Sequence, residues 1–214
     1  MVVYNQSTMG RPSTARERLL ESARGLIHSS NYGSASVEDL CAAAQVNKGS
    51  FYYYFPSKRD LALAVLDAQW ERAQANVLEP MFATDVGPLE RIDRFFEQVA
   101  EHHQRPVVLG CPFGNLAVEL GTIDVAIRDK VRDILAGYRG YFKHAIEDAV
   151  QVGAIPPIDA DVAAQALVAY LQGALLLAKT HNDAGVIRSL GPYARGLVGG
   201  APAAQPRNGD VCND

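Results

Sequence analysis

The stretch VNKGSFYYYFPSK, residues 46–58, contains three adjacent tyrosines between two lysines. Tyrosine hydroxyls and lysine ammonium groups donate hydrogen bonds to phosphate oxygens, and an aromatic ring can pack on a thymine methyl group. Gly49 lets the backbone approach a partner closely, because glycine has no side chain. These residue types at this spacing predict a surface that contacts nucleic acid.

The elements that must position this surface are two short helices. Residues 36–55 read as a helix-turn-helix. At about 100° per residue, Phe51 and Phe55 share the buried face of the second helix, and Gly49 and Tyr53 point most directly away from it. Asn47 can open that helix, whose N-terminal N–H groups suit an anion. A recognition helix for the DNA major groove fits this arrangement. The alternative is a core helix with a buried aromatic cluster.

A second candidate for chemistry is Cys111 in the stretch CPFGNLAVELG. A helix follows it at once, and the positive end of a helix lowers the pKa of a cysteine. His102 and His103 are near in sequence and could add positive charge. The alternative is a buried cysteine that only packs. Because adjacent histidines point about 100° apart on a helix, we expect no metal site and no cofactor.

Surplus aromatic and polar residues in the C-terminal three-quarters of the chain predict a mostly apolar pocket for a small organic ligand. Each of these residues is alternatively a plain core residue. The candidates are Trp70, Phe95, His102, Cys111, Phe113, Asn115, Tyr138, Tyr141, Phe142 and Tyr170.

Apolar residues recur at helical spacing almost throughout, so we predict an all-α fold of about nine helices. Among these helices we expect one over about 124–152 and a last one over about 184–198. The run 162–178 is apolar nearly all round and short for a membrane span, so no membrane partner is expected. Small residues on it allow a second helix to approach, which predicts a homodimer; the alternative is burial within a monomer. The predicted interface comprises Ala166, Tyr170, Gly173, Ala174, Leu177, Leu190, Tyr193 and Leu197.

Charge is distributed unevenly along the chain. Residues 10–59 carry seven Lys and Arg against four Asp and Glu, residues 60–214 carry thirteen against twenty, and the net charge is −4. The N-terminal part, residues 10–59, is called the head below, and the remainder, residues 60–214, the body. A basic head followed by an acidic body indicates that only the head has DNA as a partner. The three cysteines, Cys41, Cys111 and Cys212, are far apart, and the N-terminus has no secretion signal pattern, so a reducing cytoplasm is expected.

The segment SVEDLCAAAQVNKGSFYYYFPSKRDL, residues 36–61, closely resembles the helix-turn-helix of the TetR family of bacterial transcriptional repressors. The resemblance implies a three-helix DNA-binding domain over 10–56 and a ligand-binding and dimerisation domain over 57–199. Residues 1–9 and 200–214 are expected to be disordered tails. The positions that the resemblance assigns to DNA contact are Arg11, Ser36, Asn47, Lys48, Gly49, Ser50, Tyr52, Tyr53, Tyr54 and Lys58. Tyr54 stands where many members carry His.

The stretch GCPFGNLAVEL resembles a motif of a TetR subgroup that includes sensors of reactive electrophiles. The function expected is a ligand-responsive regulator, a repressor that binds a palindromic operator as a dimer and is released by a small organic or electrophilic inducer. No fingerprint of a hydrolase, metalloprotease or nucleotide-binding enzyme occurs in the chain, so no enzyme activity is expected. The alternatives are a cysteine-dependent enzyme acting on small electrophiles and a DNA-binding activator without a ligand.

Overall fold

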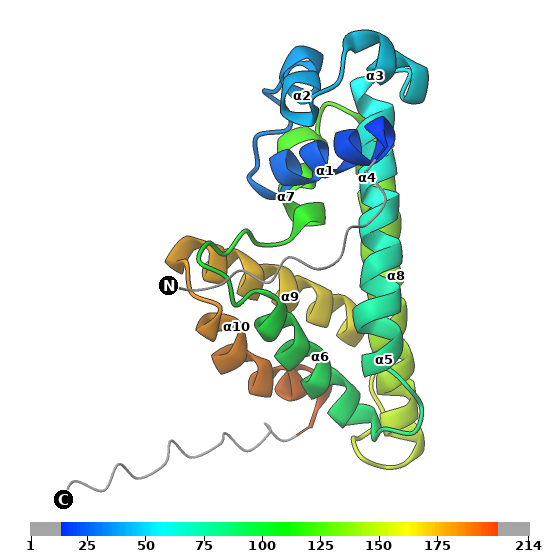
Figure 1. Ribbon diagram of the computed structural model, residues 1–214. Coiled ribbons are helices and arrows are strands. Elements are labelled where there is room, and N and C mark those ends of the chain that lie inside the picture. Colours follow the sequence, from blue (N-terminus) through cyan, green and yellow to red (C-terminus); the bar gives the residue numbers. More distant parts are fainter. Residues whose placement is uncertain (1–13, 201–214) are drawn as a thin grey trace, which may run out of the picture.

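The computed structural model describes residues 14–200, which form helices and no strand, with nine α-helices of six residues or more. This confirms the predicted all-α fold (Figure 1). The helices are α1 (Ala15–His28), α2 (Val37–Ala44), α3 (Lys48–Tyr54), α4 (Lys58–Ala73), α6 (Pro88–His102), α7 (Pro112–Leu120), α8 (Val125–Gln151), α9 (Ala160–His181) and α10 (Gly185–Leu190). Shorter elements are the π-helical turn η1 (Gln74–Leu78), α5 (Glu79–Met81) and the 3-10 helix η2 (Gly191–Val198).

Capping side chains start the three helices of the head. Thr14 forms a capping box with Glu17 at the start of α1, and Ser36 forms one with Asp39 at the start of α2. Asn47 caps α3 by accepting a hydrogen bond from the backbone N–H of Ser50. Each cap satisfies a helix N–H group that has no partner within its helix, so these short helices begin where the sequence places such residues.

One continuous rod connects the head to the body. α4 runs through η1 into α5 without a break, and the rod lies alongside α8 (Figure 1). Ser57 caps its beginning by accepting from the N–H of Asp60. The head and the body are therefore joined by continuous helical backbone rather than by a loop.

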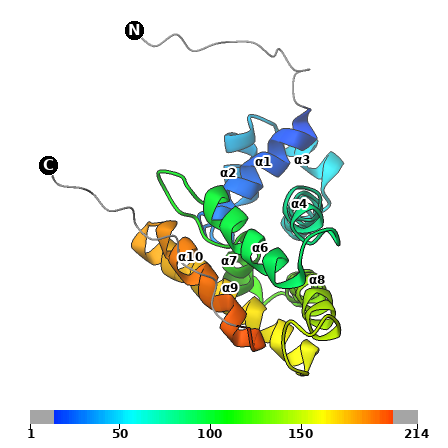
Figure 2. The same cartoon turned by 90° about the horizontal axis from the view of Figure 1, so that it is seen from below.

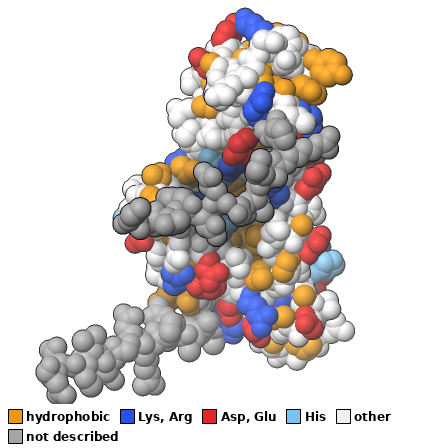
Figure 3. Space-filling model, viewed as in Figure 1, with side chains coloured by type: hydrophobic (Ala, Val, Ile, Leu, Met, Phe, Trp, Pro, Cys, Tyr) orange, Lys and Arg blue, Asp and Glu red, His pale blue; other side chains and the backbone are white. Residues whose placement is uncertain are grey.

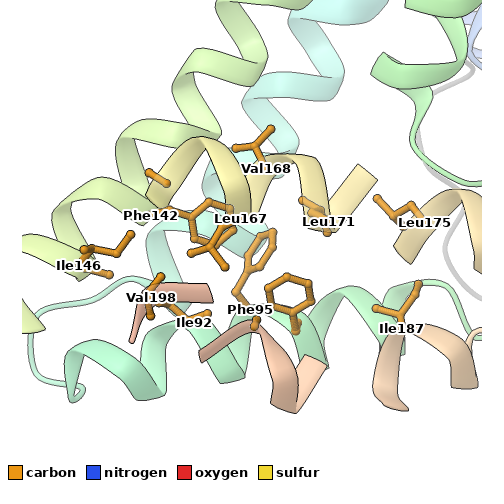
Figure 4. Close-up of a cluster of buried hydrophobic side chains, with 14 of the residues drawn as sticks. Ile92, Phe95, Phe142, Ile146, Leu167, Val168, Leu171, Leu175, Ile187 and Val198 are labelled. Atoms are coloured by element: carbon orange, nitrogen blue, oxygen red, sulfur yellow. The ribbon is translucent and has the colours of Figure 1, made fainter. Parts of the chain in front are cut away.

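Two hydrophobic cores fill the molecule. The body core joins side chains of α6, α8, α9 and η2, which point toward one another in Figure 4. The head core joins α1–α4 to Phe113 and Leu116 of α7 and to Ile127, Val131 and Ile134 of α8. The packing of the head thus continues past residue 57 into two helices of the body.

The last helical segment differs from the single helix expected over 184–198. α10 ends at Leu190, and the chain continues as the 3-10 helix η2. Gly191 lies so close to α6 that a Cβ atom there would be 3.1 Å from the Cβ of Phe96. Pro192 follows and has no N–H to continue the α-helical bonding.

By length and composition, α9 is the one helix within residues 14–200 that could cross a membrane. Core helices of soluble proteins meet the same criteria, and eight residues of α9 are buried in the protomer.

Candidate nucleic-acid interface and its junction with the body

The three tyrosines of α3 lie on the outside of the head. Tyr53 is 81% exposed, and Tyr52 and Tyr54 are also exposed, whereas Phe51 and Phe55 are buried in the head core. Hydrophobic side chains are visible at the tip of the head, over α3, in Figure 3. The buried aromatic cluster considered as an alternative is therefore wrong for the tyrosines, and the helix turns its phenylalanines inward as the spacing predicts.

The beginning of α3 carries the other predicted contact residues. The Asn47 side-chain oxygen accepts a hydrogen bond from the backbone N–H of Ser50 at 2.7 Å. This N–H group therefore already has a partner within the head. The Lys48 ammonium forms an ion pair with Glu38 of α2. A Cβ atom at Gly49 would lie 3.2 Å from the Asn47 side-chain oxygen, so this position also favours a small residue for a local reason.

Two predicted contact residues have partners within the head. The Ser36 hydroxyl donates to Asp39 at 2.7 Å within the capping box. The Lys58 ammonium donates to the carbonyl oxygens of Gly33, at 3.0 Å, and Ala35, at 2.5 Å, and lies 4.8 Å from the centre of the Tyr32 ring. Burial lowers the pKa of Lys58. Arg11 lies outside the described residues.

Tyr32 is a structural residue of the head that its sequence position did not single out. It is buried, and its hydroxyl donates to the Lys58 carbonyl oxygen at 2.6 Å. Together with the Lys58 ammonium, this bond fastens the loop between α1 and α2 to the start of α4. The signal that could have identified it is a lone tyrosine in a polar loop beside glycine and serine.

Asn115 joins the head to α7. Its amide nitrogen donates to the carbonyl oxygens of His28, at 2.9 Å, and Leu109, at 3.0 Å. Its oxygen accepts from the Lys179 ammonium of α9 at 3.2 Å, which also donates to the Ser30 hydroxyl at 2.9 Å. Asn115, which was predicted to line the pocket, instead uses its side-chain amide for hydrogen bonds that connect α1, α7 and α9. These bonds are called the Asn115 link below.

His28 ends α1 at the same junction. Its Nε2 lies 2.8 Å from the Gln69 amide nitrogen of α4, which can only donate, so this ring nitrogen accepts. Burial, followed by the positive charges of Arg24 and Arg105, lowers the pKa of His28 to about 4. The ring also lines a small cleft of the surface with the predicted pocket residue His102.

Cys111 caps the start of α7. Its sulfur accepts from the Gly114 N–H at 3.4 Å and from the Gln172 amide at 3.5 Å. Burial raises the pKa of the Cys111 thiol, and those hydrogen bonds offset only part of the effect. The lowered pKa expected from the sequence is therefore wrong, because loss of solvation outweighs the favourable end of the helix. No histidine within residues 14–200 is among the groups that lower the pKa of this thiol. The His103 Nδ1 lies 2.8 Å from the Val99 carbonyl oxygen.

The aromatic residues predicted for the pocket lie next to one another. Trp70, Cys111 and Tyr138 pack against both cores. The Trp70 and Tyr138 ring centres are 5.2 Å apart, and Phe113 lies 6.2 Å from Tyr138. These separations are those of packed rings, so a ligand here would have to part them.

The other predicted pocket residues extend the aromatic set into the body core. Phe95 and Phe142 are buried there with ring centres 5.1 Å apart. Tyr141 lies against Phe82, with 5.6 Å between the ring centres. The Tyr170 hydroxyl donates to the Leu190 carbonyl oxygen at 2.8 Å, so it is engaged within its own protomer.

Known proteins resemble both parts of this arrangement. Residues 19–65 match the family of bacterial regulatory proteins of the tetR type, and residues 88–190 match a tetracyclin repressor-like C-terminal domain. A helix-turn-helix transcriptional regulator from Lactococcus lactis is 30% identical over 88% of this chain and 92% of its own. The chain belongs to the TetR family.

Two further comparisons cover most of this TetR-family chain. The transcriptional repressor DhaR from a Mycobacterium species is 29% identical over 78% of this chain and 84% of its own. The crystal structure of a regulatory protein TetR from Rhodobacter sphaeroides is 28% identical, with a TM-score of 0.76 over 87% of this chain and 98% of its own. The relatives are thus transcriptional regulators.

The outer face of α9 and the C-terminal elements lie along one side of the body of this TetR-family protein (Figure 2). Leu177, Tyr193 and Leu197 are exposed there, and Gly173 is exposed with open space for 4 Å around the position that a Cβ atom would take. Ala166 and Leu190 are half-buried. Ala174 is a correction to the predicted interface: it is only 2% exposed and faces the interior of its own protomer.

The sequence also missed two exposed apolar side chains of α9. Val162 and Leu176 are 65% and 64% exposed. Both continue the outward stripe that contains Gly173, at spacings of three, four and seven residues. The sequence signal was present, but the helix is apolar nearly all round, so its pattern alone did not separate the inner from the outer face.

Proposed function

We propose that this TetR-family regulator is a repressor that binds a palindromic operator as a homodimer and leaves it when a small organic or electrophilic inducer binds. The observation that carries the proposal is the outward face of α3, where Tyr52, Tyr53 and Tyr54 are exposed on a capped helix-turn-helix. In this proposal residues 10–56 contact the DNA, and residues 57–199 bind the inducer and form the dimer. The protein acts in the cytoplasm, where its operator lies, and is not an enzyme.

The exposed apolar face of α9, α10 and η2 supports dimerisation through these elements. Leucine and tyrosine side chains exposed on one stripe lose contact with water when a second copy covers them. Because Gly173 leaves open space on this stripe, a partner helix can approach closely. Two protomers joined here would present their α3 helices to half-sites roughly 34–36 Å apart, the spacing of one helical turn of DNA.

An inducer acts, in this proposal, where the two cores meet. Trp70, Cys111 and Tyr138 belong to the packing of both cores. A ligand that parts these rings shifts α4 against α8 and α7 against α1. The Asn115 link and the continuous α4 rod support transfer of that shift to the head.

The electrophilic route rests on Cys111 and on the resemblance of its motif to the electrophile-sensing subgroup. The raised pKa of the thiol makes it a slow nucleophile at neutral pH. Alkylation at its sulfur would remove the Gln172 hydrogen bond and add bulk between the two cores. The reversible organic ligand is therefore the first candidate and the electrophile the second.

The test begins with selection of bound sites from random duplex DNA. We expect a palindrome, bound as one dimer or more. Lys48→Ala should weaken binding to every duplex and flatten its salt dependence, because a phosphate contact is lost.

Tyr53→Ala should instead change sequence preference at one position of each half-site, because a base contact is lost. A wild-type protein that selects no sequence would overturn the proposal.

The second candidate inducer, the electrophile, is tested on the complex of the protein with its operator. Treatment with a quinone should release wild-type protein and leave Cys111→Ser bound if the electrophilic route operates. Equal release of both proteins, or of neither, would remove that route and leave the reversible ligand. A turnover assay with the same quinone separates a sensor from a cysteine-dependent enzyme, because a sensor reacts once per thiol.

A further inference from the structure

We propose that Glu38 limits the affinity of the head for duplex DNA by holding the Lys48 ammonium in an ion pair beside the recognition helix. The inference rests on the proposed function and adds to it a residue that sets binding strength. Glu38 is the second residue of α2, and Lys48 is the first residue of α3. The pair therefore bridges the two helices of the helix-turn-helix on its outer surface.

The pair is exposed to solvent on both sides. The side chain of Lys48 is 54% exposed and that of Glu38 is 60% exposed. Each partner favours the charged form of the other: the hydrogen bond with Lys48 lowers the pKa of Glu38, and the one with Glu38 raises the pKa of Lys48. Both groups are thus charged at neutral pH and accessible to DNA.

Groups other than this ion pair start α2 and close the turn that follows it. The neighbouring Asp39 caps α2 together with Ser36, whereas Glu38 forms no cap. The turn between α2 and α3 is closed by a backbone hydrogen bond from Val46 to Cys41 at 2.9 Å and by the left-handed residue Gln45, with φ of 53°. Exposed ion pairs add little stability. As an acid in the first turn of α2, Glu38 favours that helix through its charge, and its ion pair also places it beside the DNA-facing lysine.

The other basic groups of the described head are engaged elsewhere. Lys58 donates to two backbone carbonyl oxygens, and Arg59 pairs with Asp124, the N-cap residue of α8. Arg24 pairs with Glu21, Arg16 lies over the Phe55 ring, and Arg18 donates to the Gln45 carbonyl oxygen. Lys48 is the lysine on α3 itself, so its availability has a large effect on phosphate binding.

Glu38 and a DNA phosphate compete for the same ammonium group. While Lys48 stays with Glu38, the pair brings no net charge to the duplex and releases no counterion. A Lys48–phosphate contact therefore forms only when the Lys48–Glu38 ion pair breaks. This cost weakens binding to any sequence, because the contact that it opposes is one with the backbone of the DNA.

The experiment compares Glu38→Gln with Glu21→Gln. Each removes one negative charge from the head and keeps the side-chain length, but Glu21 is on α1 and pairs with Arg24. Binding of the full-length protein to its selected operator and to a random duplex is measured by fluorescence anisotropy across a salt series. We expect Glu38→Gln to bind both duplexes roughly three- to tenfold more tightly, with a somewhat steeper salt slope, because the ion pair only partly occupies Lys48 in the wild type. Glu21→Gln should change either affinity less than twofold.

A double-mutant cycle with Lys48→Gln decides whether the effect passes through Lys48. In the Lys48→Gln background, Glu38→Gln should lose most of its gain. An equal gain in both backgrounds would mean simple repulsion of DNA by Glu38 and would overturn the proposal. Unchanged or weaker operator binding by Glu38→Gln, with a wild-type melting temperature, would overturn it as well. Those results leave the proposed function intact, whereas a wild-type protein that binds no operator removes both.

Discussion

At the scale of single residues, His28 shows how the position of a side chain in the fold changes its pKa. It lies where α1 ends against the body and accepts a hydrogen bond from Gln69. The charged or imidazole groups that oppose its protonation are Arg24 of its own helix and Arg105, His102 and His103 from the end of α6 and the loop after it. Glu21, also on α1, is an acid whose charge interacts with His28, but burial and the opposing groups together outweigh it.

We predict that His28 makes the protein less stable in mild acid. The unfolded chain binds a proton near pH 6.5, but folded His28 binds one only near pH 4. Stability is therefore complete above pH 6.5 and falls as the pH drops to 4, with no further loss from this group below. After allowance for solvent screening, His28→Gln should reduce that fall by about 1–2 kcal/mol in denaturant unfolding.

His144→Gln is the control for this prediction. The His144 side chain is 86% exposed on α8 and lies near Glu147. This variant should keep the wild-type dependence on pH. A His28→Gln protein that loses stability in parallel with wild type would contradict the assignment.

At the scale of elements, α8 is a helix whose two glycines have opposite surroundings. A Cβ atom at Gly137 would lie 2.5 Å from the Trp70 ring, whereas Gly140 has nothing within 4 Å. Trp70 is itself packed against Tyr138. The close approach of α4 to α8 thus depends on the missing side chain at Gly137.

The predicted outcome is opposite for the same substitution at the two glycines. Gly137→Ala should destabilise the protein by about 1–3 kcal/mol, because the rigid indole has little room to move. Gly140→Ala should stabilise it by about 0.5–1 kcal/mol, because alanine favours a helix and meets no obstacle. Thermal and denaturant unfolding of both variants test this. Equal effects at both positions would show that Trp70 is free to rearrange.

At the scale of the whole molecule, the proposed regulation requires that the body control the spacing of two heads. Within one protomer, the head core already includes residues of α7 and α8, and Trp70 and Tyr138 touch both cores. The head is therefore packed against the body and is not an independent domain on a flexible linker. Control over a pair of heads additionally requires the proposed dimer.

We predict that Gly173→Glu yields a folded monomer. Gly173 is exposed, and a Cβ atom there would have nothing within 4 Å in its own protomer, so folding should be preserved. In the proposed interface the carboxylate would be buried without a partner, at a cost of about 3–5 kcal/mol. Sedimentation should show monomers, and operator binding should be lost. Gly140→Glu, equally exposed but on α8, should remain a dimer; a Gly173→Glu dimer would place the interface elsewhere.

The sequence was most informative about local structure. Asn47 predicted the start of α3 because a cap depends on residues within three positions along the chain. The phenylalanines and tyrosines of α3 could be assigned to opposite faces because helical geometry alone sets their angles. The motif of residues 36–61 was likewise sufficient for the family.

Tertiary structure decided what depends on distant contacts and on solvation. Lys58 turns to the loop after α1, and Ala174 faces the interior, because neighbours remote in sequence lie there. The pKa of Cys111 rises because two cores close over it, which no local pattern encodes. Periodicity specifies that a face is apolar, but only packing specifies which partner covers it. The protonation state of a side chain likewise depends on tertiary structure, because burial removes the water that stabilises its charged form.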